Sequence, residues 1–197
     1  PDETSYVGAI DVGGVARAAL SNVTIFGREY FSTGPEYPSG ICLSVVFRDQ
    51  TVGQVADTLI LNYPSNLSNE FFQESLFEGL SAGLVAQDES AVLVKNTGVA
   101  GHAYGIVSLN TAKAVVFNSV IFENYYGITN SNAAIVVVNS SFSYNQVGLV
   151  MIPGEMIPGE ASGPTAEVWF STITDNGIAD DFSEGDFFSS GGGVLAA

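Results

Sequence analysis

The chain has 197 residues and a formal net charge of −16 at pH 7, from 21 acidic residues and only five basic ones. Hydrophobic residues make up 46% of it and charged residues 13%, with 22 glycines, a composition that favours a turn-rich β protein over long helices. Five scattered cations cannot form a basic patch, and no apolar run reaches the ~18 residues that span a bilayer, so we expect neither nucleic-acid binding nor membrane insertion.

The amino-terminal part of the chain shows only a faint pattern. Four of its residues repeat the spacing of a set further along the chain: Ala18, Leu20, Asn22 and Ile25 match Ala114, Val116, Asn118 and Ile121. The stretches ICLSVVFRD and ADTLILNY read as strands, and polar, proline-containing turns separate them. We therefore predict less regular coils over residues 1–71.

Regular repeats follow over residues 72–150. They begin at Gly83, Gly105, Gly127 and Gly148, at spacings of 22, 22 and 21 residues. When the repeats are aligned on these glycines, apolar residues fall into four columns: Val94/Val116/Val137, Val92/Ala114/Ile135, Val99/Ile121/Phe142 and Ile106/Ile128/Leu149. The first two columns lie two residues apart, the spacing of side chains on one face of a strand, so we expect them to point inward. The glycines fit a corner that needs a positive φ or close backbone approach.

Two polar columns are equally regular. The first contains Asn96, Asn118 and Asn139, two residues after the valine column, and we predict an inward ladder of stacked amides at a bend. The second contains His102, Asn124 and Asn145, three residues before each glycine. In this second ladder we expect His102 to cap the turn through its imidazole.

The rhythm is interrupted once. The spacing from Asn145 to Asn176 exceeds the usual 21 by ten residues, the length of the tandem MIPGEMIPGE. We therefore predict an inserted loop over 151–165, a last coil over 166–180, and an acidic, glycine-rich tail over 181–197. All of these parts belong to a single domain, residues 1–197, of the all-β class.

The motif of an apolar residue, two spacers, Asn, a short gap and Gly-Ile or Gly-Leu resembles the right-handed parallel β-helix superfamily. Its members include pectate-lyase-like enzymes, tailspikes and bacterial surface proteins. The segments that carry the resemblance are Ile121–Asn124, Phe142–Asn145 and Ile173–Asn176. The resemblance implies a single-stranded right-handed parallel β-helix, or β-solenoid, with coils of about 21–22 residues. It implies no activity by itself.

The sequence offers few groups for catalysis or cofactor binding. One histidine and one cysteine exclude a clustered His/Cys metal site, and we assign no catalytic residue. A strip of tyrosines is a candidate ligand-binding surface, with rings that fill a groove as the simpler reading: Tyr104, Tyr125, Tyr126 and Tyr144. Acidic residues near the carboxyl end are candidate calcium ligands, with a merely acidic segment as the favoured alternative: Asp175, Asp180, Asp181 and Glu184. Apart from this calcium, we expect no cofactor.

Three functions remain open on these observations. The first is a non-catalytic extracellular or cell-surface solenoid, structural or adhesive, whose uncapped ends associate with copies of itself, end to end into filaments. The second is a polysaccharide lyase or hydrolase, for which Asp88, Glu89 and Glu123 are the available carboxylates. The third is a carbohydrate-binding module. We favour the first and lean against an enzyme.

Overall fold

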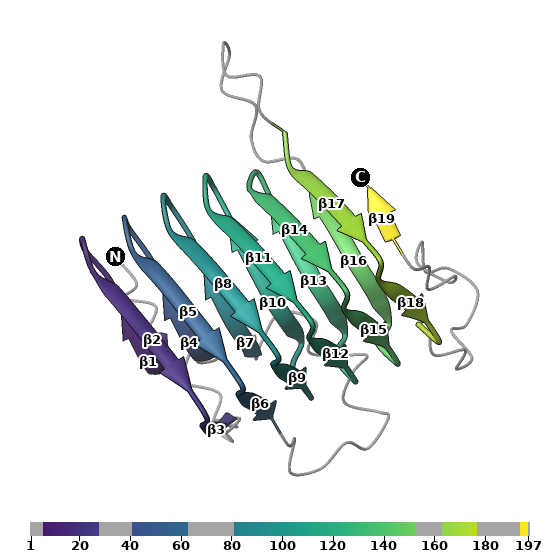
Figure 1. Cartoon of the computed structure of the whole chain (residues 1–197), viewed down its shortest axis with the longest axis horizontal. Coiled ribbons are helices and arrows are strands. Elements are labelled where there is room, and N and C mark those ends of the chain that lie inside the picture. Colours follow the sequence, from purple (N-terminus) through teal and green to yellow (C-terminus); the bar gives the residue numbers. More distant parts are fainter. Residues whose placement is uncertain (1–5, 28–40, 63–80, 153–162, 177–193, 197) are drawn as a thin grey trace, which may run out of the picture.

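The structure, a computed structural model, describes residues 6–27, 41–62, 81–152, 163–176 and 194–196. Every regular element in these ranges is a β-strand, and every pairing between strands is parallel. The strands form three sheets that run along the molecule, as Figure 1 shows from its purple to its yellow end. The predicted all-β parallel solenoid is therefore confirmed.

Sheet A has seven strands: β1 (Tyr6–Val12), β4 (Ile41–Phe47), β7 (Ser81–Ala86), β10 (Tyr104–Leu109), β13 (Tyr126–Ser131), β16 (Val147–Ile152) and β19 (Val194–Ala196). Sheet B has six, in front in Figure 1: β2 (Arg17–Ser21), β5 (Val52–Ala56), β8 (Ala91–Lys95), β11 (Lys113–Phe117), β14 (Ala134–Val138) and β17 (Thr165–Trp169). Sheet C has six short ones: β3 (Thr24–Gly27), β6 (Leu59–Asn62), β9 (Gly98–Ala100), β12 (Val120–Phe122), β15 (Ser141–Ser143) and β18 (Thr172–Thr174).

Each turn of the chain adds one strand to every sheet, because neighbours within a sheet are three strands apart in sequence. The register pairs Ile106 with Ile128 and Ile128 with Leu149, so these coils have the length that the glycine spacing predicts. The earlier coils are longer: Ile10 pairs with Val45 and Val45 with Leu84, 35 and 39 residues apart. The extra length falls on residues 28–40 and 63–80, outside the described ranges.

The core lies between the three sheets and draws on every coil. All four predicted apolar columns are buried in it, with Val94, Val116 and Val137 fully inaccessible to solvent. The faint match at the amino end is confirmed too, because Ala18, Leu20 and Ile25 lie in register with the later columns through β5 and β6. Burial of such columns in every turn is what makes a solenoid's stability a sum over neighbouring coils.

The repeat glycines allow close approach and do not bend the chain. They lie inside the strands of sheet A, and only Gly14 and Gly101 have a positive φ among the described glycines. A Cβ at Gly105 or Gly127 would lie 2.5 Å from the carbonyl oxygen of the glycine one coil further on. The expected corner position is therefore wrong, and the alternative of close backbone approach is right.

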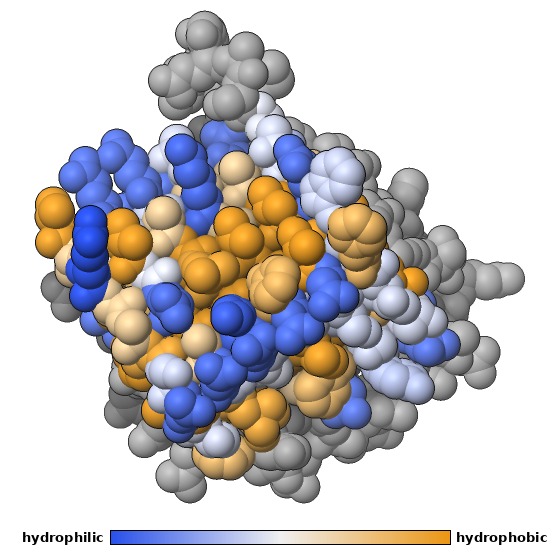
Figure 2. Space-filling view, viewed as in Figure 1, coloured by the Kyte–Doolittle hydropathy of each residue, from blue (hydrophilic) through white to orange (hydrophobic). Residues whose placement is uncertain are grey.

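The outer faces of the sheets differ. On sheet A a second apolar cluster is buried on the side opposite the core: Val46, Ala82, Val85 and Val107. Sheet B instead exposes apolar side chains, which gather as an orange patch in Figure 2: Val52, Leu93, Val115 and Phe117. No helix in the described part of the chain has the length and hydropathy that crossing a membrane requires.

Candidate functional site

The buried ladder consists of His102, Asn124, Asn145 and Asn176 at the corner between sheets C and A. The side-chain oxygen of Asn124 accepts the backbone N–H of His102 at 3.0 Å, and that of Asn145 accepts the N–H of Asn124 at 3.0 Å. Each amide nitrogen donates to a carbonyl of the preceding coil, as Asn145 does to Ile121 at 3.0 Å. Every amide thus ties two coils together, and its oxygen satisfies a backbone N–H in the interior.

His102 occupies the first described position of this ladder and is 3% exposed. Burial lowers the pKa of its imidazole to about 4, a shift that a hydrogen bond to the backbone of Ile60 opposes. Ile60 is the counterpart of Val99, whose carbonyl accepts the amide of Asn124. The imidazole therefore reaches the same carbonyl column as the asparagines, but without the short, well-aligned bonds that their amides make.

The exposed ladder consists of Asn96, Asn118 and Asn139 at the corner between sheets B and C. Its amides stack as predicted, since Asn118 donates to Asn96 at 2.7 Å and Asn139 donates to Asn118 at 3.1 Å. The predicted inward orientation is wrong, because all three side chains are exposed. Each residue has a left-handed φ of 48–50°, which ends the strand's alternation and turns the side chain outward. Asp57 begins the ladder by accepting from Asn96.

Three of the four candidate tyrosines come together. The rings of Tyr104 and Tyr126 stack with centroids 5.2 Å apart, and Tyr125 meets Tyr126 edge-on at 4.7 Å. Burial raises the pKa of both Tyr104 and Tyr126, and Tyr104 packs against the apolar cluster on the outer face of sheet A. Tyr144 is 60% exposed and lies in another column, at a corner. The rings of Tyr104, Tyr125 and Tyr126 thus pack against one another, and Tyr104 also packs on the outer face of sheet A.

The candidate calcium ligands are only partly within the described residues. Asp175 is exposed at the corner after β18, with a φ of 50°. Asp180, Asp181 and Glu184 lie outside the described ranges, as do 153–162 of the predicted loop and most of the tail. Within the described ranges, no three histidine, cysteine or carboxylate side chains are grouped so that they could hold a metal ion.

A carboxylate-lined hollow lies at the corner after sheet A, and two of the carboxylates that the sequence offered, Asp88 and Glu89, line it, although the sequence did not predict the hollow. It is open and measures about 340 Å³, and its lining is Gly14, Val15, Asp49, Gln50, Asp88 and Glu89. Asp49 lies two residues beyond Phe47 and Asp88 two beyond Ala86, and these two strand residues pair. The carboxylates therefore belong to one column on adjacent coils. Asn110 and Asn132 continue this column, with the same left-handed backbone.

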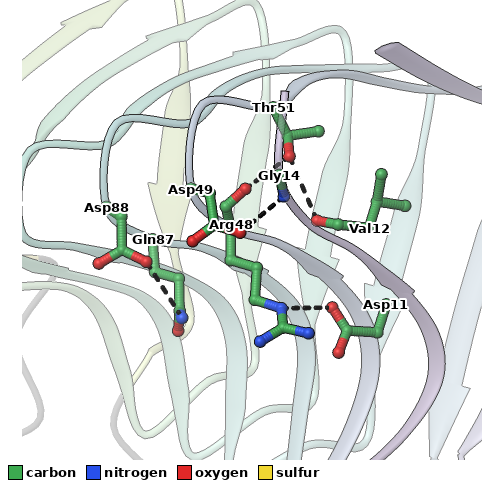
Figure 3. Close-up of polar contacts among 8 residues, drawn as sticks. All are labelled: Asp11, Val12, Gly14, Arg48, Asp49, Thr51, Gln87 and Asp88. Carbon is green, nitrogen blue, oxygen red and sulfur yellow. Dashed lines mark hydrogen bonds and ion pairs between the residues drawn. The ribbon is translucent and has the colours of Figure 1, made fainter. Parts of the chain in front are cut away.

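The carboxylates of this hollow accept hydrogen bonds from neighbouring groups, and Figure 3 draws those from Gly14 to Asp49 and from Gln87 to Asp88. Asp49 accepts the backbone N–H of Gly14 at 2.6 Å, and Asp88 accepts the amide of Asn110 at 2.9 Å. Arg48 does not line the hollow, and its guanidinium pairs with Asp11 at 3.0 Å, as Figure 3 also shows. The lining of the hollow thus presents acidic oxygens held by hydrogen bonds, and no basic side chain is among the described residues that form it.

An exposed aromatic pair, which the sequence analysis did not predict, lies at the end of β17, the last described strand of sheet B. Phe170 is 89% exposed and Trp169 54%. Phe170 has a φ of 50° and stands in the column of Asn118 and Asn139, where it replaces an amide. The sequence carries a signal for it, because Phe170 follows Asn139 at the same separation along the chain as Asn176 follows Asn145.

A scan of protein-family descriptions finds none that matches this chain, and a search of curated proteins finds no match either.

Proposed function

We propose that this protein is a non-catalytic extracellular or cell-surface solenoid that associates with copies of itself through its last coil. We also propose a right-handed, single-stranded β-helix of the pectate-lyase-like superfamily. Crossovers between parallel strands are right-handed in about 98% of cases, and the Phe142–Asn145 motif with its repeats supports the superfamily.

The exposed Phe170 carries the proposal of self-association. A large aromatic residue in the left-handed region is unfavourable, and exposure of its ring adds the cost of hydrating an apolar surface. Five earlier coils place an amide or carboxylate at this corner: Asn22, Asp57, Asn96, Asn118 and Asn139. The exchange of a polar residue for Phe in the terminal coil alone favours burial of this ring against a partner.

The strands of this coil add a second argument. Within the described residues, β17 pairs only with β14 and β18 only with β15, so each forms one edge of its sheet. Beside these edges, Val168 is 39% exposed although it continues the column of the fully buried Val137. Free sheet edges next to apolar side chains are the usual sites of strand-on-strand association.

Phe170→Asn tests the proposal by restoring the residue of the preceding coils. We expect self-association, measured by sedimentation over a range of concentrations, to weaken about tenfold or more, since burial of a Phe ring is worth about 1.5–3 kcal/mol. Phe117→Lys is the matched control, because Phe117 is exposed in mid-stack and Lys95 occupies its column one coil earlier. A wild-type chain that stays monomeric, with no filaments or smaller assemblies in electron micrographs, contradicts the proposal.

The carboxylate hollow favours a second candidate function, in which the chain acts on or binds a polysaccharide. Asp49 and Asp88 stand in one column on adjacent coils ~4.8 Å apart, a backbone spacing close to the carboxylate separation of retaining glycosidases. Release of reducing ends or of unsaturated products from acidic polysaccharides, and its loss in Asp88→Asn, would support an enzyme. Binding without turnover would support a carbohydrate-binding module.

A further inference from the structure

We infer that Asn22 is a site of N-glycosylation and that Asn139 is not. The described residues contain two Asn-X-Ser/Thr sequences, Asn22-Val23-Thr24 and Asn139-Ser140-Ser141, and both asparagines lie at the same corner of the coil. A third, at Asn66, lies outside the described ranges. The motif alone does not separate these asparagines, whereas the hydrogen bonds of the exposed ladder do.

The hydrogen bonds of the exposed ladder all run in one direction along the stack. As a result, the amide nitrogen of Asn22 takes no part in the ladder. Each asparagine donates its Nδ2 to the side chain of the preceding coil, as Asn139 does to Asn118 and Asn96 to Asp57. Asn22 belongs to the first described coil, so no described coil precedes it. Within the described residues its Nδ2 bonds only to the adjacent Ser21 hydroxyl, at 3.2 Å on the surface. This nitrogen is the atom that carries an N-linked sugar.

The surroundings of the two motifs differ in the same sense. Asn22, Val23 and Thr24 are all exposed. In the other motif Ser140 is 4% exposed and its hydroxyl accepts the backbone N–H of Ser119, so this sequence is part of the packed corner. A sugar on Asn139 would have to fit between side chains on coils ~4.8 Å apart. A sugar on Asn22 meets no described coil on its outer side.

The reaction forms a bond between Nδ2 of Asn22 and C1 of the first sugar of a lipid-diphosphate-linked oligosaccharide. The C1–O bond to the diphosphate breaks, and the amide loses a proton as the lipid diphosphate leaves. This inference rests on the proposed extracellular location, because the donor and its transferase act on secreted chains. The glycan stands at the first coil and leaves the Trp169–Phe170 end of the stack uncovered.

The test uses the full chain, secreted from a yeast behind a cleavable signal peptide, with Asn66→Gln as the background. Amidase removal of N-glycans converts the carrier asparagine to aspartate, which peptide mass spectrometry locates. We expect one glycan, at residue 22. Thr24→Ala should abolish it while Asn22 remains, Thr24→Ser should restore it, and Asn139→Gln should leave it unchanged. Circular dichroism of each secreted variant checks the fold.

Two results overturn the inference. One is a secreted, folded chain without a glycan at residue 22, and the other is a glycan at residue 139. Glycan occupancy is measured by mass spectrometry and self-association by sedimentation. The glycosylation inference can therefore be contradicted while the proposed self-association is supported, and self-association can be contradicted while glycosylation is supported.

Discussion

The buried and exposed ladders use the same residue at the same spacing, yet their amides make different contacts. The side chain of Asn145 bonds a backbone carbonyl and a backbone N–H of the preceding coil, and none of it is exposed. Among the described residues, the side chain of Asn118 bonds only its stacked neighbours, in solvent. The difference teaches that repetition of a polar residue marks a corner, whereas its backbone partners decide what that corner contributes to stability.

Asn145→Ala tests this comparison at its strongest point. It leaves the N–H of Asn124 unpaired in the interior, removes the bond from the amide to the carbonyl of Ile121, and empties the space of the amide. We expect the free energy of unfolding to fall by about 3–5 kcal/mol, measured by denaturant titration.

Asn139→Ala is the matched control for this variant, because it removes an amide of the exposed ladder from the same coil. We expect it to cost about 1 kcal/mol, mostly through the left-handed backbone. Equal losses in the two variants would contradict the distinction between the ladders.

His102→Asn asks whether the buried ladder accepts its usual residue at the position where the chain has an imidazole. An asparagine can donate to the carbonyl of Ile60 as Asn124 does to Val99, so we expect the variant to be at least as stable as the wild type at pH 7. The stability difference between the variant and the wild type should be larger at acidic pH, because an asparagine does not titrate.

The pH dependence follows from the lowered pKa of His102. Between its usual value of 6.5 and about 4, the unfolded chain binds the proton and the folded chain does not, so the wild type loses stability as the pH falls through this window. The loss amounts to about 3 kcal/mol at most and is complete near pH 4. The stability difference between His102→Asn and the wild type should widen by this amount. A constant difference from pH 7 to pH 4 would exclude a buried neutral imidazole.

The sequence predicted the columns of this solenoid but not which way every column faces. Val94 and Asn96 are two residues apart, and alternation along a strand would place both inside. Asn96 has a φ of 50°, so the strand ends there and the rule no longer applies. In contrast, the predicted inward positions of Val92 and Val94 are confirmed, because both lie within the strand β8.

The candidate sites were harder to predict than the coils. The hollow joins Asp49 to Asp88, residues 39 positions apart, because the second coil is far longer than the regular ones. A search at the period of the regular coils cannot align these two carboxylates. The position of Phe170 in the asparagine column could have been predicted from the spacing. Its significance could not, because a phenylalanine there only interrupts the pattern until its exposure is known.

Asn118→Gly gives the smallest and most discriminating effect. A glycine adopts a φ of 48° without steric cost, so this variant removes the stacked amide without straining the backbone. We expect a loss within about 0.5 kcal/mol in denaturant titration, against about 1 kcal/mol for Asn118→Ala, which keeps the strain and also lacks the amide. If Asn118→Gly costs as much as Asn118→Ala, the stacked amides themselves hold the corner. The exposed ladder would then contribute to stability through its side chains, and its contrast with the buried ladder would be one of degree.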